Sequence, residues 1–154
     1  MPLELVDVEP SWAAVARRVT RWTELPSAIA SAMRVDFGAL RALQSGHNIF
    51  VYRPGPDGTV ELGCGFQVAG PFEPTGEVQP GAVEREIVCD AIPGGRAAHA
   101  VHIGPYHELK QTWDPLLDAI RAAGLPTDGV QWEVYGDWHE DPACLRTDVY
   151  VRVG

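Results

Sequence analysis

The predicted order of secondary structure occurs twice in this chain, and that repeat constrains the fold more than any other feature. Alternating and helical patterns predict strand, strand, helix, strand, strand over residues 3–68 and again over residues 83–153. Phe50-Val51-Tyr52 in the first copy occupies the place of Glu133-Val134-Tyr135 in the second. A duplicated half-fold encloses a cleft between its copies, so positions at which the copies differ are candidates for a binding site.

The chain's 154 residues suffice for one domain with its own core, divided into a first half (1–68), a Pro- and Gly-rich linker (69–82) and a second half (83–154). The three cysteines, Cys64, Cys89 and Cys144, are widely spaced and form no C-x-x-C pair. This pattern favours a reducing, cytoplasmic location over a disulfide framework or a zinc site. No segment resembles a signal peptide or a membrane span.

The net charge of −9 bears on the choice of partner. Nucleic-acid binding needs a basic surface for the phosphates, so the charge argues against it. An acidic surface favours small cationic partners through long-range attraction, although it also serves solubility alone. The histidines fall at no recognised ligand spacing, and we expect neither a metal nor a cofactor.

Each half is predicted to hold four strands and one long helix, which makes an α+β fold on an antiparallel sheet. The first helix is expected over 24–44, with Thr23 as N-cap and Gly46 as C-cap, and the second over 106–123. Gly63 and Gly65 predict a bulge or a close backbone approach within their strand. Strands are expected over 3–9, 13–20, 48–53, 59–68, 84–92, 96–103, 130–138 and 147–153.

The strand predicted over 130–138 carries the sharpest functional signal. Side chains alternate across a strand, so Val130, Trp132 and Val134 share one face and Glu133 and Tyr135 share the other. We expect the apolar face to pack on the helix of its own half. The Glu133 face then looks away from that helix.

The corresponding strand of the first copy has the same arrangement, with Ile49 and Val51 expected to face their helix and Phe50 and Tyr52 to face away. If the copies pair about a pseudo-twofold axis, the two outward faces converge. One carboxylate would then lie among aromatic rings, a setting that suits an organic cation or a flat aromatic ligand. The plainer alternative is a solvated glutamate on a polar strand face.

Two segments resemble those of a known family. His102-Ile103-Gly104-Pro105-Tyr106 is similar to the H-x-G-P-Y segment of GyrI-like small-molecule-binding domains. The stretch from Trp132-Glu133-Val134-Tyr135 through Asp141-Pro142 to residues 147–151 resembles the C-terminal signature of that family. The family includes effector-binding domains of AraC-type and MerR-type transcription regulators, stand-alone drug-binding proteins and a gyrase-inhibitory member.

The resemblance implies a groove between the halves that takes hydrophobic, often cationic, compounds, with Glu133 as the acidic contact. No helix-turn-helix accompanies the domain, so a regulatory role requires a separate regulator protein; a homodimer is the other partner hypothesis. The candidate ligand-binding residues are Glu133, Tyr135, Trp132, Phe50, Tyr52, Phe66, His102 and Tyr106.

Two further functions stay open at this point. Stand-alone family members with a Trp-Glu pair hydrolyse cyclopropane-bearing genotoxins, and Trp132-Glu133 matches that pair. In such an enzyme Glu133 would activate water and Tyr135 would orient it or protonate the substrate. Strict alternation, however, places Trp132 on the opposite strand face. The third hypothesis is an interaction module that acts on a protein such as gyrase.

Overall fold

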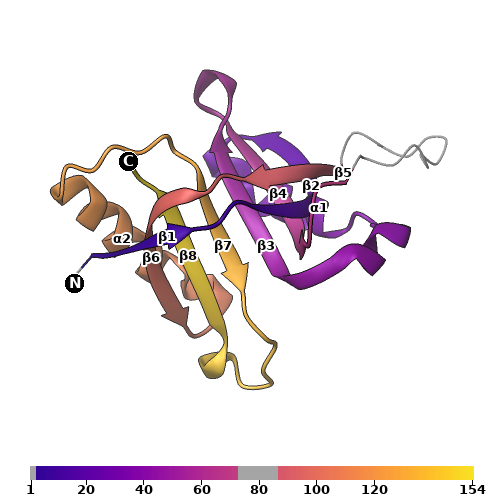
Figure 1. The fold of residues 1–154 in the computed structure, drawn as a ribbon. Helices are drawn as coiled ribbons and strands as arrows, with labels where there is room; N and C mark the ends of the chain where they lie inside the picture. Colours follow the sequence, from indigo (N-terminus) through magenta and orange to yellow (C-terminus); the bar gives the residue numbers. More distant parts are fainter. Residues whose placement is uncertain (1–2, 73–86) are drawn as a thin grey trace.

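The computed structural model describes residues 3–72 and 87–154 (Figure 1). The first half comprises β1 (Glu4–Val8), β2 (Ser11–Thr20), α1 (Leu25–Met33), β3 (Gln44–Pro54) and β4 (Val60–Val68). The second comprises β5 (Ile87–Ile92), β6 (Gly95–Ile103), α2 (Lys110–Ala122), β7 (Gln131–Tyr135) and β8 (Arg146–Arg152). Short 3-10 helices precede the two α-helices, η1 (Trp22–Glu24) before α1 and η5 (Tyr106–Glu108) before α2.

The strands form one antiparallel sheet in the order β1-β6-β8-β7-β3-β4-β2-β5. Strands β1, β2, β3 and β4 of the first half correspond to β5, β6, β7 and β8 of the second. When each strand is replaced by its counterpart and the sheet is read from the β5 edge, the same order results. The halves meet where β3 pairs with β7, over Ile49–Tyr52 and Gln131–Val134. The α+β class predicted from sequence is confirmed, whereas duplication as the origin of the halves stays a prediction.

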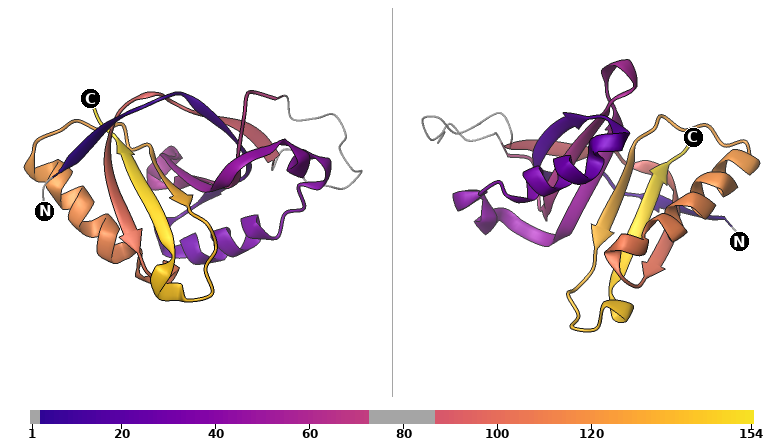
Figure 2. Two further views of the ribbon diagram at one scale, coloured as in Figure 1. Left: turned by 60° about the horizontal axis from the view of Figure 1, so that its bottom comes forward. Right: turned by 180° about the vertical axis from the view of Figure 1, so that it is seen from behind.

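Both α-helices cover the same face of the sheet, one over each half (Figure 2, right). On this face α1 packs against a cluster that includes Tyr52, Cys64 and Phe66. The α2 residues Leu116 and Ile120 pack against β6 and β8 through residues such as Val149. We call this the helix face.

The opposite face closes on itself, because the sheet is strongly curved (Figure 2, left). The prediction that Val130, Trp132 and Val134 pack on their helix is therefore wrong, as is the same prediction for Ile49 and Val51. These side chains pack together and against apolar residues of the outer strands. Distant strands thus supply the cover expected from a helix; they contribute Val6, Val8, Val15, Val88, Ile92 and Ala97.

The single helix predicted over 24–44 is also wrong in its second part. Helix α1 ends at Met33, and the Asp36 carboxylate accepts a hydrogen bond from the Gly38 amide at 2.8 Å. Gly38 adopts φ +53°, a conformation that glycine tolerates best, and a 3-10 helix over Gly38–Leu43 follows. Strand β3 then begins at Gln44, so Gly46 lies inside a strand, and Thr23 makes no cap.

Gly65 makes the close backbone approach expected for its strand. A Cβ atom at this position would overlap the carbonyl oxygen of Ala14 on the neighbouring strand β2. Most of the predicted linker and the first residues of the second half lie outside the described residues. Among the helices of the described residues, none is long and apolar enough to cross a membrane.

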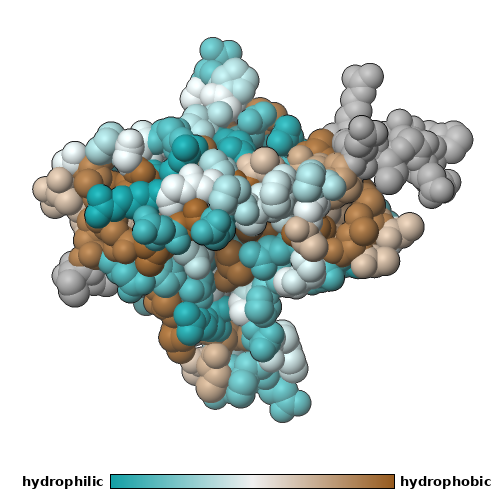
Figure 3. Space-filling view, in the orientation of Figure 1, coloured by the Kyte–Doolittle hydropathy of each residue, from teal (hydrophilic) through white to brown (hydrophobic). Residues whose placement is uncertain are grey.

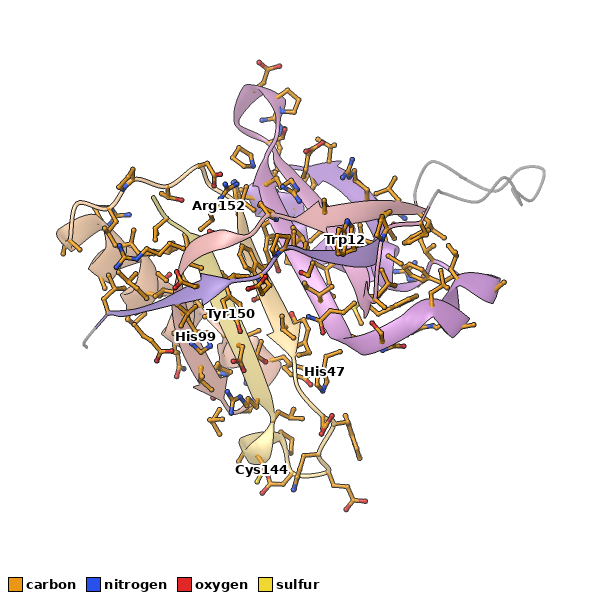
Figure 4. All side chains as sticks on the ribbon, in the orientation of Figure 1. Trp12, His47, His99, Cys144, Tyr150 and Arg152 are labelled. Atoms are coloured by element: carbon orange, nitrogen blue, oxygen red, sulfur yellow. The ribbon has the colours of Figure 1, made fainter. Side chains whose placement is uncertain are left out.

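One polar network ties β1 to the sheet. The His99 ring lies 2.8 Å from a Glu4 carboxylate oxygen on β1 and 2.8 Å from an Asp148 oxygen on β8. It also stacks on Tyr150, and the two rings are labelled side by side in Figure 4. Because His99 bridges both carboxylates, the edge strand is fixed over the curved face.

Candidate functional site

Glu133 lies at the boundary between the halves. It is directly opposite Phe50 on β3 and Val149 on β8, so all three side chains project from the helix face. Its side chain is 3% exposed, which excludes a solvated glutamate on a polar strand face. A buried carboxylate requires hydrogen-bond donors, and the neighbouring elements provide them.

Three neutral donors hold the two carboxylate oxygens of Glu133. The hydroxyls of Tyr52 and Tyr135 donate to Oε1 at 2.6 Å and 3.0 Å. The indole nitrogen of Trp113, on α2, donates to Oε2 at 2.7 Å. Hydrogen bonds to an ionised acceptor are about twice as strong as neutral ones, so this set stabilises the carboxylate in place.

Aromatic rings surround this group in two layers. Phe50 packs edge-on against Tyr135 at 4.9 Å between ring centroids, and Tyr106 does so from the other side at 5.2 Å. Trp22 stacks on Tyr52 at 6.3 Å. Trp22 and Tyr106 are 54% and 40% exposed. The rings of Tyr52 and Tyr135 therefore lie between the buried carboxylate and two rings that reach solvent.

Burial and the charge of Glu133 set the protonation of the neighbouring groups. Burial first, and then the carboxylate, raises the pKa of both Tyr52 and Tyr135, so both phenols remain donors. The same two causes raise the pKa of the Cys64 thiol to about 12. Within residues 3–72 and 87–154, none of the recorded ion pairs involves Glu133.

A family model for the GyrI-like small molecule binding domain matches residues 1–153. The chain belongs to the GyrI-like family. The resemblance predicted from the His102–Tyr106 and Trp132–Tyr135 segments is therefore confirmed. The domains of this family are described as small-molecule-binding domains.

Solved structures with the same fold include SAV2435 bound to tetraphenylphosphonium, at 11% identity and a TM-score of 0.74, with 100% of this chain and 94% of that chain covered. The EcmrR C-terminal domain matches at 17% identity and a TM-score of 0.65, covering 99% and 97% of the two chains. A hydrolase from Listeria innocua matches at 13% identity and a TM-score of 0.56, covering 99% and 91%. No match was found among curated proteins. At these identities the likeness is one of fold.

Within this GyrI-like domain, four of the residues predicted from sequence lie around Glu133: Tyr135, Tyr52, Phe50 and Tyr106. Trp132 lies on the opposite face, buried, and stacks on Tyr150 at 5.3 Å. Strict alternation accounts for this position, and no bulge is recorded between β7 and its neighbours that would rotate the ring.

Phe66 and His102 face the helix side of the sheet but serve other contacts. Phe66 is buried beneath α1 and packs on Phe37 at 5.1 Å. The His102 nitrogens lie 2.8 Å from the Thr112 hydroxyl and 2.9 Å from the Pro105 carbonyl oxygen. His102 thereby fixes the start of α2 to β6, and through it the helix that carries Trp113.

Trp113 and Trp22 belong to the aromatic group around Glu133, but they were not among the ligand-binding residues predicted from the sequence. Trp113 belongs to the apolar stripe of its helix, a pattern that predicts burial and no polar contact. A buried indole nitrogen needs an acceptor, which is the signal that points to Glu133. Trp22 is the first residue of η1, and Tyr106 is the first residue of η5 in the other half. A comparison of the two halves therefore identifies Trp22 as the counterpart of Tyr106.

A separate cavity of about 510 Å³ lies on the other face of the sheet. Its lining includes Val134, Asp148 and Tyr150, which alternate with the residues around Glu133. The surface over this end of β7 and β8 is mostly hydrophilic (Figure 3). Among the described residues, no group of three or more His, Cys, Asp or Glu is arranged to hold a metal ion.

Proposed function

We propose that this GyrI-like domain binds hydrophobic aromatic cations at Glu133. The observation that carries the proposal is a buried carboxylate whose hydrogen-bond donors are all neutral. Neutral donors orient the carboxylate, and no ion pair recorded among the described residues neutralises its negative charge. Burying an ion without a charge of opposite sign costs free energy. A cationic ligand next to Glu133 would therefore gain a Coulomb attraction that the three neutral donors do not provide.

The rings around the carboxylate favour the same class of ligand. Each aromatic face adds about 0.5–2 kcal/mol to a nearby cation, more where water is excluded. The exposed rings of Trp22 and Tyr106 rest on Tyr52 and Tyr135, so a ligand that reaches the carboxylate from this side must displace them. A net charge of −9 raises the local concentration of cations. SAV2435, which shares the fold, has been solved with tetraphenylphosphonium.

Calorimetric titration of tetraphenylphosphonium into the wild-type protein and Glu133→Gln tests the proposal. We expect the substitution to weaken this cation at least about tenfold, or about 1.4 kcal/mol. Triphenylphosphine oxide, a neutral compound with similar rings, should change less than about threefold, since it lacks the charge.

Asp137→Asn supplies the matched control. Its carboxylate pairs with His47 and is 96% exposed, so the substitution removes the same charge without touching the aromatic group. If Asp137→Asn weakens tetraphenylphosphonium as much as Glu133→Gln does, the binding reflects overall charge and the proposal fails. It also fails if the wild-type protein binds neither compound.

Hydrolysis of cyclopropane-bearing compounds at the same residues is the second candidate. The contact that favours it is the 3.0 Å hydrogen bond between Tyr135 and Glu133, an acid/base pair within reach of a bound ring. Water would form a C–O bond to a ring carbon as the strained C–C bond breaks and its electron pair passes to a conjugated carbonyl oxygen of the substrate. Glu133 would accept the proton of the water, Tyr135 would protonate that oxygen, and Glu133 would then return its proton to Tyr135. Incubation with a cyclopropane-bearing alkylator, followed by mass spectrometry, detects a product that gains one water. Wild-type turnover that Glu133→Gln abolishes would favour this candidate, and no product would exclude it for that compound.

The proposal leaves two partner arrangements, a homodimer or a complex with a separate DNA-binding regulator in the cytoplasm. EcmrR, whose C-terminal domain shares the fold, has been solved in complex with DNA. Light scattering of the purified protein measures the first arrangement. Affinity purification with and without tetraphenylphosphonium measures the second, and would also recover a protein such as gyrase.

A further inference from the structure

A buried hydroxyl near Glu133 has no partner. Thr147 on β8 is 0% exposed, and among the described residues its Oγ1 is the buried side-chain nitrogen or oxygen atom for which no hydrogen bond is recorded. Buried polar groups are almost always hydrogen-bonded, because an unpaired one loses its contacts with water and gains none. An orphan of this kind is free to bond to a group from outside the chain, either a ligand or a water molecule.

The sheet aims this hydroxyl toward the aromatic group. Thr147 lies directly opposite Tyr135 on β7 and His102 on β6, so its side chain projects from the helix face. Glu133 lies opposite Val149, the next residue along β8 that points the same way. Thr147 and Glu133 are therefore offset by one side-chain repeat, about 7 Å along the strands.

The neighbours of Thr147 are already committed. The Tyr135 hydroxyl donates to Glu133, and both ring nitrogens of His102 have partners on Thr112 and Pro105. None of these groups is recorded as a partner of Thr147, and none can donate to it without giving up a contact that it makes now. The orphan hydroxyl is thus left for a ligand.

We propose that Thr147 determines ligand specificity by hydrogen bonding to a polar group on the cation held at Glu133. This inference rests on the proposed function and narrows its ligand class. The preferred compounds carry a hydroxyl, amino or carbonyl group that is displaced from the positive centre along the strands toward Thr147, in addition to aromatic rings. A threonine hydroxyl both donates and accepts, so it serves each of these groups.

Two phosphonium probes that differ in one group test the inference. Tetraphenylphosphonium offers charge and rings alone, and (4-hydroxyphenyl)triphenylphosphonium adds one hydroxyl. For the wild-type protein and Thr147→Ser we expect the hydroxylated probe to bind about five- to tenfold more tightly, the effect of one neutral hydrogen bond. Thr147→Val keeps the side-chain shape and should remove this preference while leaving tetraphenylphosphonium unchanged.

Thermal unfolding without ligand supplies an independent arm. Thr147→Val should leave the melting temperature unchanged or raise it, because it removes a buried group that has no bond to lose. Thr112→Val is the matched control, since its hydroxyl has a partner 2.8 Å away on His102, and it should lower the melting temperature.

The outcomes separate the inference from the function beneath it. A fall in melting temperature for Thr147→Val as large as that for Thr112→Val means that the hydroxyl already holds a structural bond, and overturns the inference. Tetraphenylphosphonium binding with no wild-type preference for the hydroxylated probe overturns it as well, while the proposed function stands. If neither probe binds the wild-type protein, the proposed function fails and the inference falls with it.

Discussion

Tyr52 donates a 2.6 Å hydrogen bond to Oε1 of Glu133, although 81 positions separate the two residues in the sequence. The bond crosses from β3 to β7, where the halves meet, and both partners are buried. It joins a neutral donor to a charged acceptor inside the protein, where such bonds are strongest.

Tyr52→Phe should therefore lower the free energy of unfolding by about 1.5–3 kcal/mol, the range for a hydrogen bond to a charged group. The ring and its stacking on Trp22 remain, so the loss reports on the hydroxyl. Urea unfolding measures the change. Tyr150→Phe is the control, because Tyr150 makes ring contacts and its hydroxyl has no recorded hydrogen bond among the described residues. Equal losses in the two variants would contradict the role of the Tyr52–Glu133 bond.

Trp113 and Glu133 should prove energetically coupled. Trp113→Phe removes the indole donor 2.7 Å from Oε2 and keeps an aromatic ring. Combined with Glu133→Gln in a double-mutant cycle, it should give a coupling free energy of about 0.5–3 kcal/mol, as found for residues in one hydrogen-bond network. Denaturant unfolding of the wild type, both single variants and the double variant yields this value. Strict additivity would show that the charge of Glu133 adds nothing to the contribution of this bond to stability.

Alkaline pH should destabilise the domain through its buried phenols. Burial and Glu133 raise the pKa of Tyr52 and Tyr135, so the fold keeps both phenols protonated. Below about pH 10, the pKa of an unfolded tyrosine, neither state ionises and this contribution is fully present. Above it the unfolded chain loses protons that the fold retains, so the free energy of unfolding falls as pH rises.

Unfolding free energies measured across this alkaline range test the sign. Tyr52→Phe should flatten the slope, because one of the three phenols with a raised pKa, those of Tyr52, Tyr135 and Tyr150, is gone. A slope identical to that of the wild type would assign the alkaline loss to other groups.

The cysteines should differ sharply in reactivity. Cys64 is buried and its pKa is raised to about 12, whereas Cys144 is exposed. Because the thiolate is the reactive form, iodoacetamide at about pH 8 should label Cys144 and leave Cys64 unmodified until the protein unfolds. Peptide mass spectrometry assigns the label to each position. Comparable labelling of Cys64 in the native protein would show that its surroundings open readily.

Local pattern was enough to predict which side chains group together. Phe50, Tyr52, Glu133 and Tyr135 share a face because strands alternate and the two copies have equal spacing. Their relation to the helices was not predictable in the same way. The helices cover the face that carries Glu133, and the opposite face is covered instead by residues of distant strands such as Val8 and Ile92.

The local sequence pattern also does not predict which strand residue a helix side chain contacts. The stripe that contains Trp113 predicts burial, but the meeting of its indole with Glu133 depends on how α2 is docked. His102 and Thr112 help to fix that docking through a contact ten positions apart in the sequence. Likewise, the break after Met33 depends on one Asp36–Gly38 turn within an otherwise helical composition.

The direct opposition of Phe50 and Glu133 has an evolutionary consequence. In an ancestor with two identical halves, the same residue would stand on both sides of this pair. Two glutamates there would repel each other inside the protein, and two phenylalanines would carry no charge. If the halves arose by duplication, a single anionic site requires that they diverged at this position, and one cation for each chain is the stoichiometry expected for the proposed binding.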